Sequence, residues 1–213
     1  MADGGLLVEF SGDPGPKQRR AVRQLDMALA AKPFAGFGEA VPAFATLAVT
    51  FDPLVTDHRA VEAHLRRLLA YGSVPSGKPA ERVVEVCYDG GCAPDLDEVA
   101  ARTGLSADAV IAAHLAGTYE VVMYGFAPGY AYLTGVPAPL HLDRKPAAVR
   151  GVAAGSVIVA GAQCLVTTLT LPTGWWVIGR SPTRMLTGQE ARPFLFDVGD
   201  RVVFRRVGRD ALE

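Results

Sequence analysis

The chain has 213 residues, half of them hydrophobic, and a net charge of −1. A near-neutral chain argues against a broad electrostatic grip on nucleic acid, which needs a basic surface. No run approaches the ~18 apolar residues that span a bilayer, and the first residues carry no basic charge of the kind that opens a signal peptide. Three cysteines without a framework spacing fit a reducing compartment. We therefore expect a cytoplasmic protein that binds neither nucleic acid nor membrane.

The first part of the chain alternates short apolar runs with amphipathic helical patterns, in which residues such as Val22, Leu25 and Leu29 recur on one face. The predicted elements are a strand over 6–10, a helix over about 17–31, strands over 39–41 and 43–51, a helix over about 57–71 and a strand over 82–88. This β-α-β-β-α-β order predicts a small ferredoxin-like domain over residues 1–82. A linker-like stretch over 72–80 precedes the last strand, which could instead belong to the following domain.

Residues 83–213 are predicted to form a second domain made mostly of short strands. Two short helices over about 95–116 come first and superficially match a DNA-binding helix-turn-helix. The second of them, over 107–115, has no Lys or Arg to reach phosphates or guanine edges, so we favour a helical hairpin that covers a sheet. From Tyr119 onward, short strands alternate with Gly and Pro, which predicts a β-barrel or sandwich. The fold class is therefore α+β.

One loop stands out, because Tyr124–Leu133 combines two glycines, a proline and four aromatic residues directly after an apolar strand. Gly and Pro are typical of a strand end. Aromatic residues there have two interpretations that the residues alone leave open. The loop is either a tight turn whose rings join the core, or a rigid corner whose rings wall a pocket with backbone N–H groups at its edge.

No common catalytic motif occurs in the sequence: it has no phosphate loop, no dinucleotide-binding glycine pattern, no nucleophile elbow and no zinc-protease motif. Cys87 and Cys92 lack a second His or Cys pair, so no metal site is predicted. We expect a site built from loop residues at the barrel mouth. The candidates are His114, Tyr119, Tyr132, Arg144, Lys145, Gln163, Trp175 and Arg180. Arg144 and Arg180 could hold a carboxylate or phosphate, although for each candidate taken singly a structural or solvated role is favoured. Cys164, beside apolar residues, is interpreted as an inert buried thiol.

A set of short motifs, spread nearly end to end, carries a family resemblance. They are Pro94-Asp95-Leu96, Gly104-Leu105-Ser106, Gly125–Leu133, Ala154-Gly155-Ser156-Val157, Gly174-Trp175, Ile178-Gly179-Arg180 and Gly199-Asp200-Arg201-Val202. By their order and combination the chain resembles the family of the B component of 5-oxoprolinase. That family includes a bacterial inhibitor of a sporulation histidine kinase and allophanate hydrolase subunit 1. The chain is also similar to the first half of the carboxyltransferase region of urea amidolyase.

The resemblance implies a cyclophilin-like β-barrel over 83–213 and a homologous partner, the C component of 5-oxoprolinase or allophanate hydrolase subunit 2. In 5-oxoprolinase a further A component joins them, and the complex opens 5-oxoproline, a small cyclic amide with a carboxylate, to glutamate at the expense of ATP. This chain alone is expected to bind no cofactor, with ATP handled across the complex. The fold does not by itself imply prolyl isomerase activity.

From the resemblance and the loop chemistry we expect two groups of site residues. The expected catalytic residues are His114, Tyr132, Arg144, Gln163 and Arg180. The expected substrate-binding residues are Tyr119, Phe126, Pro128, Gly129, Tyr130 and Trp175. Backbone N–H groups of 125–129 would serve a developing oxyanion.

The sequence departs from its relatives near the expected pocket. The second of two Pro-Arg pairs is replaced by Ala148-Val149, and a Thr-Gly-Ile-Tyr-Pro stretch is replaced by Cys164–Thr168. Two alternatives therefore stay open. One is a non-catalytic module that binds a histidine kinase, and the other is a stand-alone barrel enzyme acting on a different small molecule.

Overall fold

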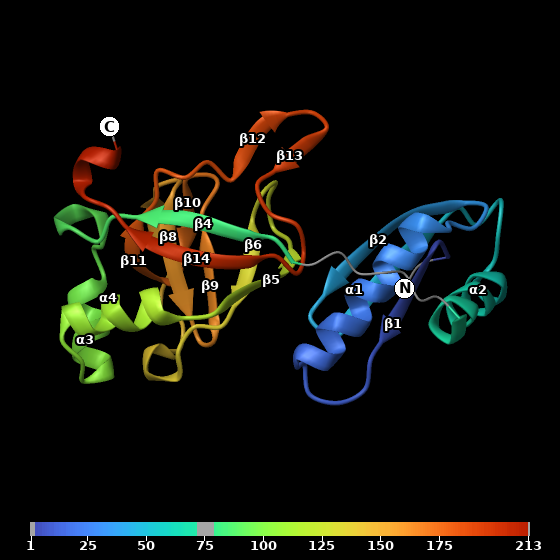
Figure 1. Ribbon diagram of the computed structural model, residues 1–213, viewed down its shortest axis with the longest axis horizontal. Coiled ribbons are helices and arrows are strands. Elements are labelled where there is room, and N and C mark those ends of the chain that lie inside the picture. The colour runs from blue at the N-terminus through green and yellow to red at the C-terminus, as the bar shows by residue number, and fades with distance from the viewer. Residues whose placement is uncertain (1–2, 72–78, 213) are drawn as a thin grey trace. The chain divides into compact units, whose positions relative to one another are not determined.

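The computed structural model describes residues 3–71 and 79–212, and the chain divides into two compact units, Met1–Pro79 and Ala80–Glu213 (Figure 1). Each unit has its own hydrophobic core, as expected for layers that bury their apolar faces separately. Of the linker-like stretch predicted over 72–80, positions 72–78 lie outside the described residues.

The first unit is an antiparallel sheet with two helices packed on it. Its elements within the described range are β1 (Gly5–Glu9), α1 (Pro16–Ala31), β2 (Phe37–Ala43), β3 (Thr46–Phe51) and α2 (His58–Tyr71). The strand order is β1–β3–β2. Because side chains alternate along a strand, Leu47, Val49 and Phe51 of the central strand all point into the core. Leu29 of α1 and Val61 of α2 are fully buried against them.

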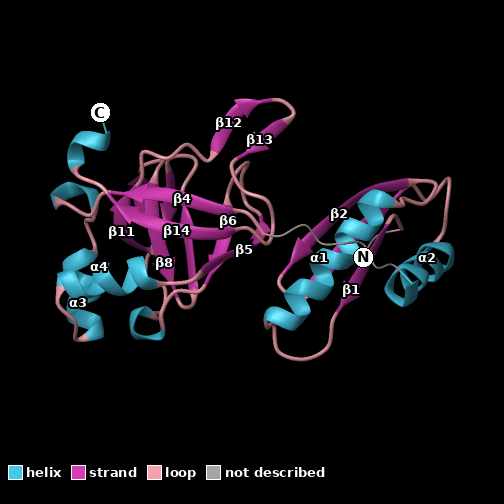
Figure 2. Ribbon diagram, in the orientation of Figure 1, coloured by secondary structure: helices cyan, strands magenta, loops and turns pink. Residues whose placement is uncertain are grey.

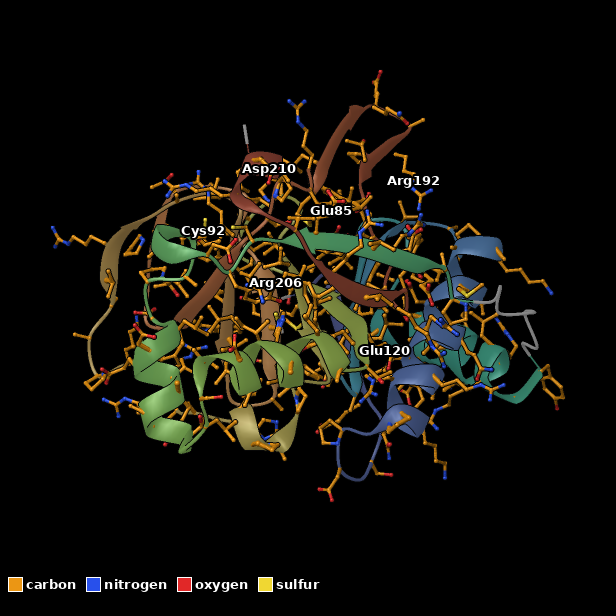
Figure 3. The ribbon with its side chains drawn as sticks, turned by 60° about the vertical axis from the view of Figure 1, so that its left-hand side comes forward. Glu85, Cys92, Glu120, Arg192, Arg206 and Asp210 are labelled. Carbon is orange, nitrogen blue, oxygen red and sulfur yellow. The ribbon has the colours of Figure 1, made fainter. Side chains whose placement is uncertain are left out.

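The strand predicted to complete the first domain lies in the second unit instead. This strand, β4 (Glu81–Val86), pairs in parallel with β14 (Arg201–Arg206) along its whole length, and the two lie side by side (Figures 1 and 3). Val84 is fully buried in the second core, and Glu85 forms an ion pair with Arg205 at 2.5 Å. The described part of the first unit therefore has the order β-α-β-β-α.

The second unit combines two helices with many short strands. Its helices are α3 (Leu96–Thr103) and α4 (Ala107–Ala116), with short 3-10 helices at Gly90–Cys92, Ala138–Leu140 and Arg209–Leu212. Its strands besides β4 and β14 are β5 (Tyr119–Tyr124), β6 (Ala131–Thr134), β7 (Val149–Val152), β8 (Ser156–Ala160), β9 (Gln163–Val166), β10 (Leu171–Thr173), β11 (Trp176–Arg180), β12 (Leu186–Gln189) and β13 (Arg192–Phe194).

The main sheet of this unit does not close into the predicted barrel. Within the described residues its strands follow the order β4–β14–β5–β6–β9–β8–β11, antiparallel except for the β4–β14 pair. The two ends of this path meet only at an isolated bridge, where Cys87 and Arg180 exchange backbone hydrogen bonds of 2.8 and 2.9 Å. A full ladder cannot continue there because the chain turns into a 3-10 helix at Gly90. The fold is thus a mixed helix and antiparallel-sheet structure.

The two faces of this sheet belong to different apolar clusters. The inner cluster includes Val121, Leu133, Val159, Trp176 and Ile178 together with residues of α3 and α4. The outer cluster comprises Tyr130, Val152, Ile158, Ala160, Leu165, Leu171, Trp175 and Val177, with Ala127 and Tyr132 packed against it. Val152 and Leu171 come from the β7–β10 pair. Side-chain alternation along each strand thus sends neighbouring residues to opposite clusters.

The helices α3 and α4 form a hairpin at one end of the sheet (Figure 2). The first helix ends at Gly104, whose φ of +71° is the left-handed conformation that favours glycine at this position. The second begins at Ser106, whose hydroxyl accepts a hydrogen bond from the N–H of Ala109 at 3.2 Å. None of the described helices is long and apolar enough to cross a membrane.

Candidate functional site

The signature loop between β5 and β6 is a tight, internally bonded turn. The N–H groups of Gly125, Ala127 and Tyr130 donate to the carbonyl oxygens of Tyr130, Gly125 and Ala127 at 3.2, 2.9 and 3.0 Å. Phe126 and Gly129 have φ values of +72° and +71°. Glycine tolerates this conformation, whereas for a bulky residue such as Phe126 it is uncommon and strained.

Two N–H groups of this loop make no hydrogen bond within the described residues. Across the described residues, no hydrogen bond uses the N–H of Phe126 or Gly129, and Pro128 has none. The carbonyl oxygen of Pro128 accepts a hydrogen bond from the Thr168 hydroxyl at 3.0 Å, which fixes the loop against the end of β9. The loop is therefore a rigid frame with two unused backbone donors, of which one belongs to the exposed Phe126 and the other to the buried Gly129. Backbone N–H groups of this kind can serve an oxyanion.

The rings of the loop extend into a continuous aromatic surface. Ring centroids are 5.2 Å apart for Phe126 and Tyr130, 5.7 Å for Tyr130 and Tyr132, and 6.1 Å for Tyr132 and Trp175. We call Phe126, Tyr130, Tyr132 and Trp175 the aromatic surface. Trp175 and Tyr130 are buried in the outer cluster, Tyr132 is half-buried, and the Phe126 side chain is 73% exposed. Both interpretations of this loop therefore apply, each to different rings: Tyr130 packs in the core, whereas Phe126 is open to solvent.

Arg144 lies over this surface, with its guanidinium carbon 5.6 Å from the centroid of the Trp175 ring. Its two neighbours hold it there. The carbonyl oxygen of Asp143 accepts from the Trp176 indole N–H at 2.8 Å, and the N–H of Lys145 donates to the carbonyl of Gly174 at 2.7 Å. The Arg144 side chain is exposed, and no carboxylate among the described residues pairs with it. It is therefore a fixed cation open to an anionic ligand.

Lys145, the next candidate, is used structurally. Its ammonium forms an ion pair with Asp95 at 2.5 Å and lies 5.3 Å from the centroid of the Trp176 ring. The same Asp95 oxygen accepts from the N–H of Val177 at 2.6 Å. Both charged side chains are mostly buried. Lys145 thus anchors the segment that carries Arg144 rather than facing a ligand.

Gln163 begins β9 opposite Thr134 of β6. Because alternate residues of a strand share a face, its side chain lies on the same side of the sheet as that of Tyr132. The structure therefore places Tyr132, Arg144, Gln163 and Trp175 on one face. This site lies on the outer face of the sheet and not, as the sequence suggested, at a barrel mouth.

His114 and Tyr119 lie away from that face, inside the inner cluster. His114 is fully buried. Its Nδ1 shares a hydrogen bond of 2.7 Å with the Tyr88 hydroxyl, and its Nε2 lies 3.6 Å from the sulfur of Cys164. The Tyr119 hydroxyl donates to the backbone carbonyl of His114 at 2.9 Å. All four side chains are therefore engaged with one another and closed to solvent.

Burial controls the protonation of this buried group. It lowers the pKa of His114 to about 3 and raises the pKa values of Cys164, Tyr88 and Tyr119 above their usual range. The imidazole is thus neutral at physiological pH and the thiol is protonated. A protonated, buried thiol is not a nucleophile.

Arg180 ends β11 with an exposed side chain, while its backbone makes the bridge to Cys87. No contact in the described structure joins its side chain to the aromatic surface. Within those described ranges, no group of three or more His, Cys, Asp or Glu side chains could hold a metal ion.

Comparison with known proteins gives the family. The model of the carboxyltransferase domain, subdomain C and D, matches residues 1–196. The chain belongs to this family. It is 33% identical to the B component of 5-oxoprolinase from Bacillus subtilis (strain 168) over 223 residues, covering 97% of this chain and 91% of that protein.

Solved structures share the fold of this chain. The crystal structure of TTHA0988 superposes with a TM-score of 0.83 at 33% identity over 95% of this chain, which spans only 40% of that protein. The Kluyveromyces lactis urea carboxylase superposes with a TM-score of 0.77 over 98% of this chain and 21% of its own length. At 14% identity, this last likeness concerns the fold alone.

Two residues that support the site in this family member were not predicted. Thr168 holds the loop through Pro128, but a threonine at a strand end gives no such signal in the sequence. Asp95 was visible within the Pro94-Asp95-Leu96 marker, yet its role depends on Lys145 and Val177, which are distant in sequence. Only the folded chain brings these partners together.

Proposed function

We propose that the chain is one component of a 5-oxoprolinase-type complex and acts on a small cyclic amide that carries a carboxylate. The Bacillus subtilis relative supports this proposal through its 33% identity over nearly the whole chain. The observation that carries it is the exposed Arg144, which has no carboxylate partner among the described residues, held over Trp175, with the aromatic surface extending from Trp175 to the signature loop. We propose that its partners are the C and A components and that the complex works in the cytoplasm. ATP would be bound by the complex and not by this chain alone. We also propose that the fold of the second unit is related to that of cyclophilin.

In this proposal each part of the outer face has a task. The Arg144 guanidinium pairs with the substrate carboxylate through two parallel hydrogen bonds. Tyr132 and Trp175 contact the flat ring of the amide. The N–H groups of Phe126 and Gly129 donate to the amide oxygen as negative charge develops on it, and the Gln163 amide orients the substrate. Burial raises the pKa of Tyr130 to about 12, so its hydroxyl remains a neutral donor.

The test is co-expression of the chain with its partner components, followed by an assay of ATP-dependent glutamate formation from 5-oxoproline. We expect turnover with the wild-type complex and a KM raised at least about ten-fold by Arg144→Gln, since a charge-assisted bond is lost. Arg67→Gln, on the exposed face of α2, is the matched control. An intact complex without turnover would refute the activity.

A second candidate is a binding module that inhibits a histidine kinase without chemistry. The exposed Phe126 ring favours it, because rigid exposed aromatic residues often anchor protein interfaces. A pull-down with kinase dimerisation helices tests it, with Phe126→Ala expected to abolish capture. Absence of binding to any such kinase would remove this candidate.

A further inference from the structure

A pocket lies along the segment that joins the end of β11 to the start of the β12–β13 hairpin, which is labelled in Figure 1. It has a volume of about 330 Å³ and is lined by the turn before β8, by Thr167 and Thr168 after β9, and by residues 181–186. Leu186 and Thr168 lie next to Gly129, so the pocket borders the signature loop. None of the lining residues belongs to the site proposed above.

Two hydroxyl groups that line this pocket, those of Ser181 and Thr183, each keep a proton that they can donate. Ser181 Oγ accepts from the N–H of Thr183 at 3.1 Å, and Thr183 Oγ1 accepts from the N–H of Glu85 at 3.0 Å. Among the described residues, neither hydroxyl has an acceptor for its own proton. A hydroxyl whose lone pair already binds an N–H still has one proton to donate. Ser181 and Thr183 therefore offer two donors to a ligand rich in acceptors.

The charge of the pocket points the same way. Arg184 lines it with an exposed side chain, and no ion pair in the described part of the chain neutralises that guanidinium. No lining residue is acidic. The carboxylate of Glu85, which is labelled in Figure 3, forms an ion pair with Arg205 at 2.5 Å. The only formal charge at the pocket is thus positive.

The wall opposite Arg184 is rigid. Gly155 has a φ of +83°, accepts from the N–H of Ser181 at 2.7 Å, and donates its own N–H to the carbonyl of Thr167 at 2.7 Å. The Thr167 hydroxyl bonds both the N–H of Ser156 and the carbonyl of Ala153. A wall fixed by its own hydrogen bonds holds the donors in place before a ligand arrives, which lowers the entropic cost of binding.

We propose that this pocket binds a small oxyanion, a carboxylate or a phosphate, through the hydroxyls of Ser181 and Thr183 and the guanidinium of Arg184. Both anions present several acceptor oxygens and a negative charge, which match two hydroxyl donors and one cation. The proposal concerns binding by this chain and holds whether or not the complex hydrolyses 5-oxoproline.

The test is an NMR titration of the full-length chain, following the backbone amides of Gly155 and Thr183. The probes are acetate, 5-oxoproline and inorganic phosphate, with neutral 2-pyrrolidinone as the ligand that lacks the carboxylate. We expect saturable shifts with at least one anion and none at these amides with 2-pyrrolidinone. Shifts with the carboxylates alone identify a carboxylate pocket, and shifts with phosphate alone identify a phosphoryl pocket.

Variants decide whether the binding is at this pocket. Arg184→Gln should weaken binding at least about ten-fold, because a charge-assisted contact is removed, and its exposed position leaves the fold intact. Thr183→Ser keeps the hydroxyl and should keep binding, and Arg67→Gln should leave it unchanged. The proposal is overturned if no anion gives saturable shifts, or if Arg184→Gln binds as well as wild type.

Discussion

The two faces of the main sheet in the second unit use polar side chains in opposite ways. On the inner face, the polar atoms of Tyr88, His114 and Tyr119 bond to one another or to backbone and are closed to solvent. On the outer face, Arg144 and the N–H groups of the loop keep donors without partners among the described residues. Burial and unused hydrogen-bonding capacity, and not residue type, therefore separate structural polar groups from ligand-binding ones.

Neighbouring residues show the same division at close range. Trp176 points inward, where Lys145 and Arg102 lie 5.3 and 5.0 Å from its ring centroid, whereas Trp175 points outward beneath Arg144. Lys145, over Trp176, thus anchors its segment, whereas its neighbour Arg144, over Trp175, stays open to solvent. Trp175, Arg144 and Lys145 lie outside the strands. The hydrogen bond from the Lys145 N–H to the Gly174 carbonyl holds the two segments beside each other.

The largest effect is expected from removing the buried imidazole. His114→Ala should lower the free energy of unfolding by about 4 kcal/mol, because it leaves a cavity and an unpaired Tyr88 hydroxyl. Urea unfolding measures it, with His64→Ala, whose ring is more exposed, as the control. If stability were unchanged while activity of the complex disappeared, His114 would be catalytic and the division between the two faces would be wrong.

Lowering the pH should destabilise the folded chain through His114 on the inner face. The pKa of His114 is about 3 in the folded chain, below the ordinary value near 6.5, so the unfolded state takes up the proton first as the pH falls. This contribution to stability is complete above about pH 6.5 and is lost towards pH 3. From pH 5.5 to 3.5 we expect it to fall by about 2.5 kcal/mol.

The measurement is the urea midpoint as a function of pH. Carboxylates contribute to the same pH range, so the informative quantity is the slope of wild type minus that of His114→Asn. Leu54→Ala, at an exposed residue without a titratable side chain, should keep the wild-type slope. Equal slopes for wild type and His114→Asn would show that the buried imidazole does not titrate as proposed.

Asp95 links the two faces, and its loss should have a smaller effect. Asp95→Asn removes the negative partner of the mostly buried Lys145 and weakens the bond to Val177, which should cost about 2 kcal/mol of stability. Because Lys145 fixes the segment carrying Arg144, KM for 5-oxoproline should also rise in the complex. The exposed pair Glu98–Arg102 supplies the control Glu98→Gln, which should change little. Stability equal to wild type would contradict the anchoring role.

Sequence patterns predicted most of the elements and the loop, since periodicity and Gly or Pro positions are local properties. They could not assign β4 to the second unit, because its buried Val84 and Val86 suit either core. They also placed His114, in a predicted helix, and Arg144, in a predicted loop, in one candidate set, since both are polar residues that a ligand could use. Whether such a side chain is closed in or left open depends on partners such as Tyr88 and Asp95, which only the fold brings near.

The smallest stability change is expected where the two properties of the loop meet. Phe126→Gly releases a bulky residue from a φ of +72° and loses a ring contact with Tyr130, so the opposing effects should leave stability within about 1 kcal/mol of wild type. Binding of 5-oxoproline by the complex should nevertheless weaken, because an exposed wall of the site is gone. The control is Leu54→Gly, which makes the same kind of change at an exposed apolar residue of the first unit. A stability loss of several kcal/mol with unchanged binding would make Phe126 a structural residue and limit the site to Tyr132, Arg144 and Trp175.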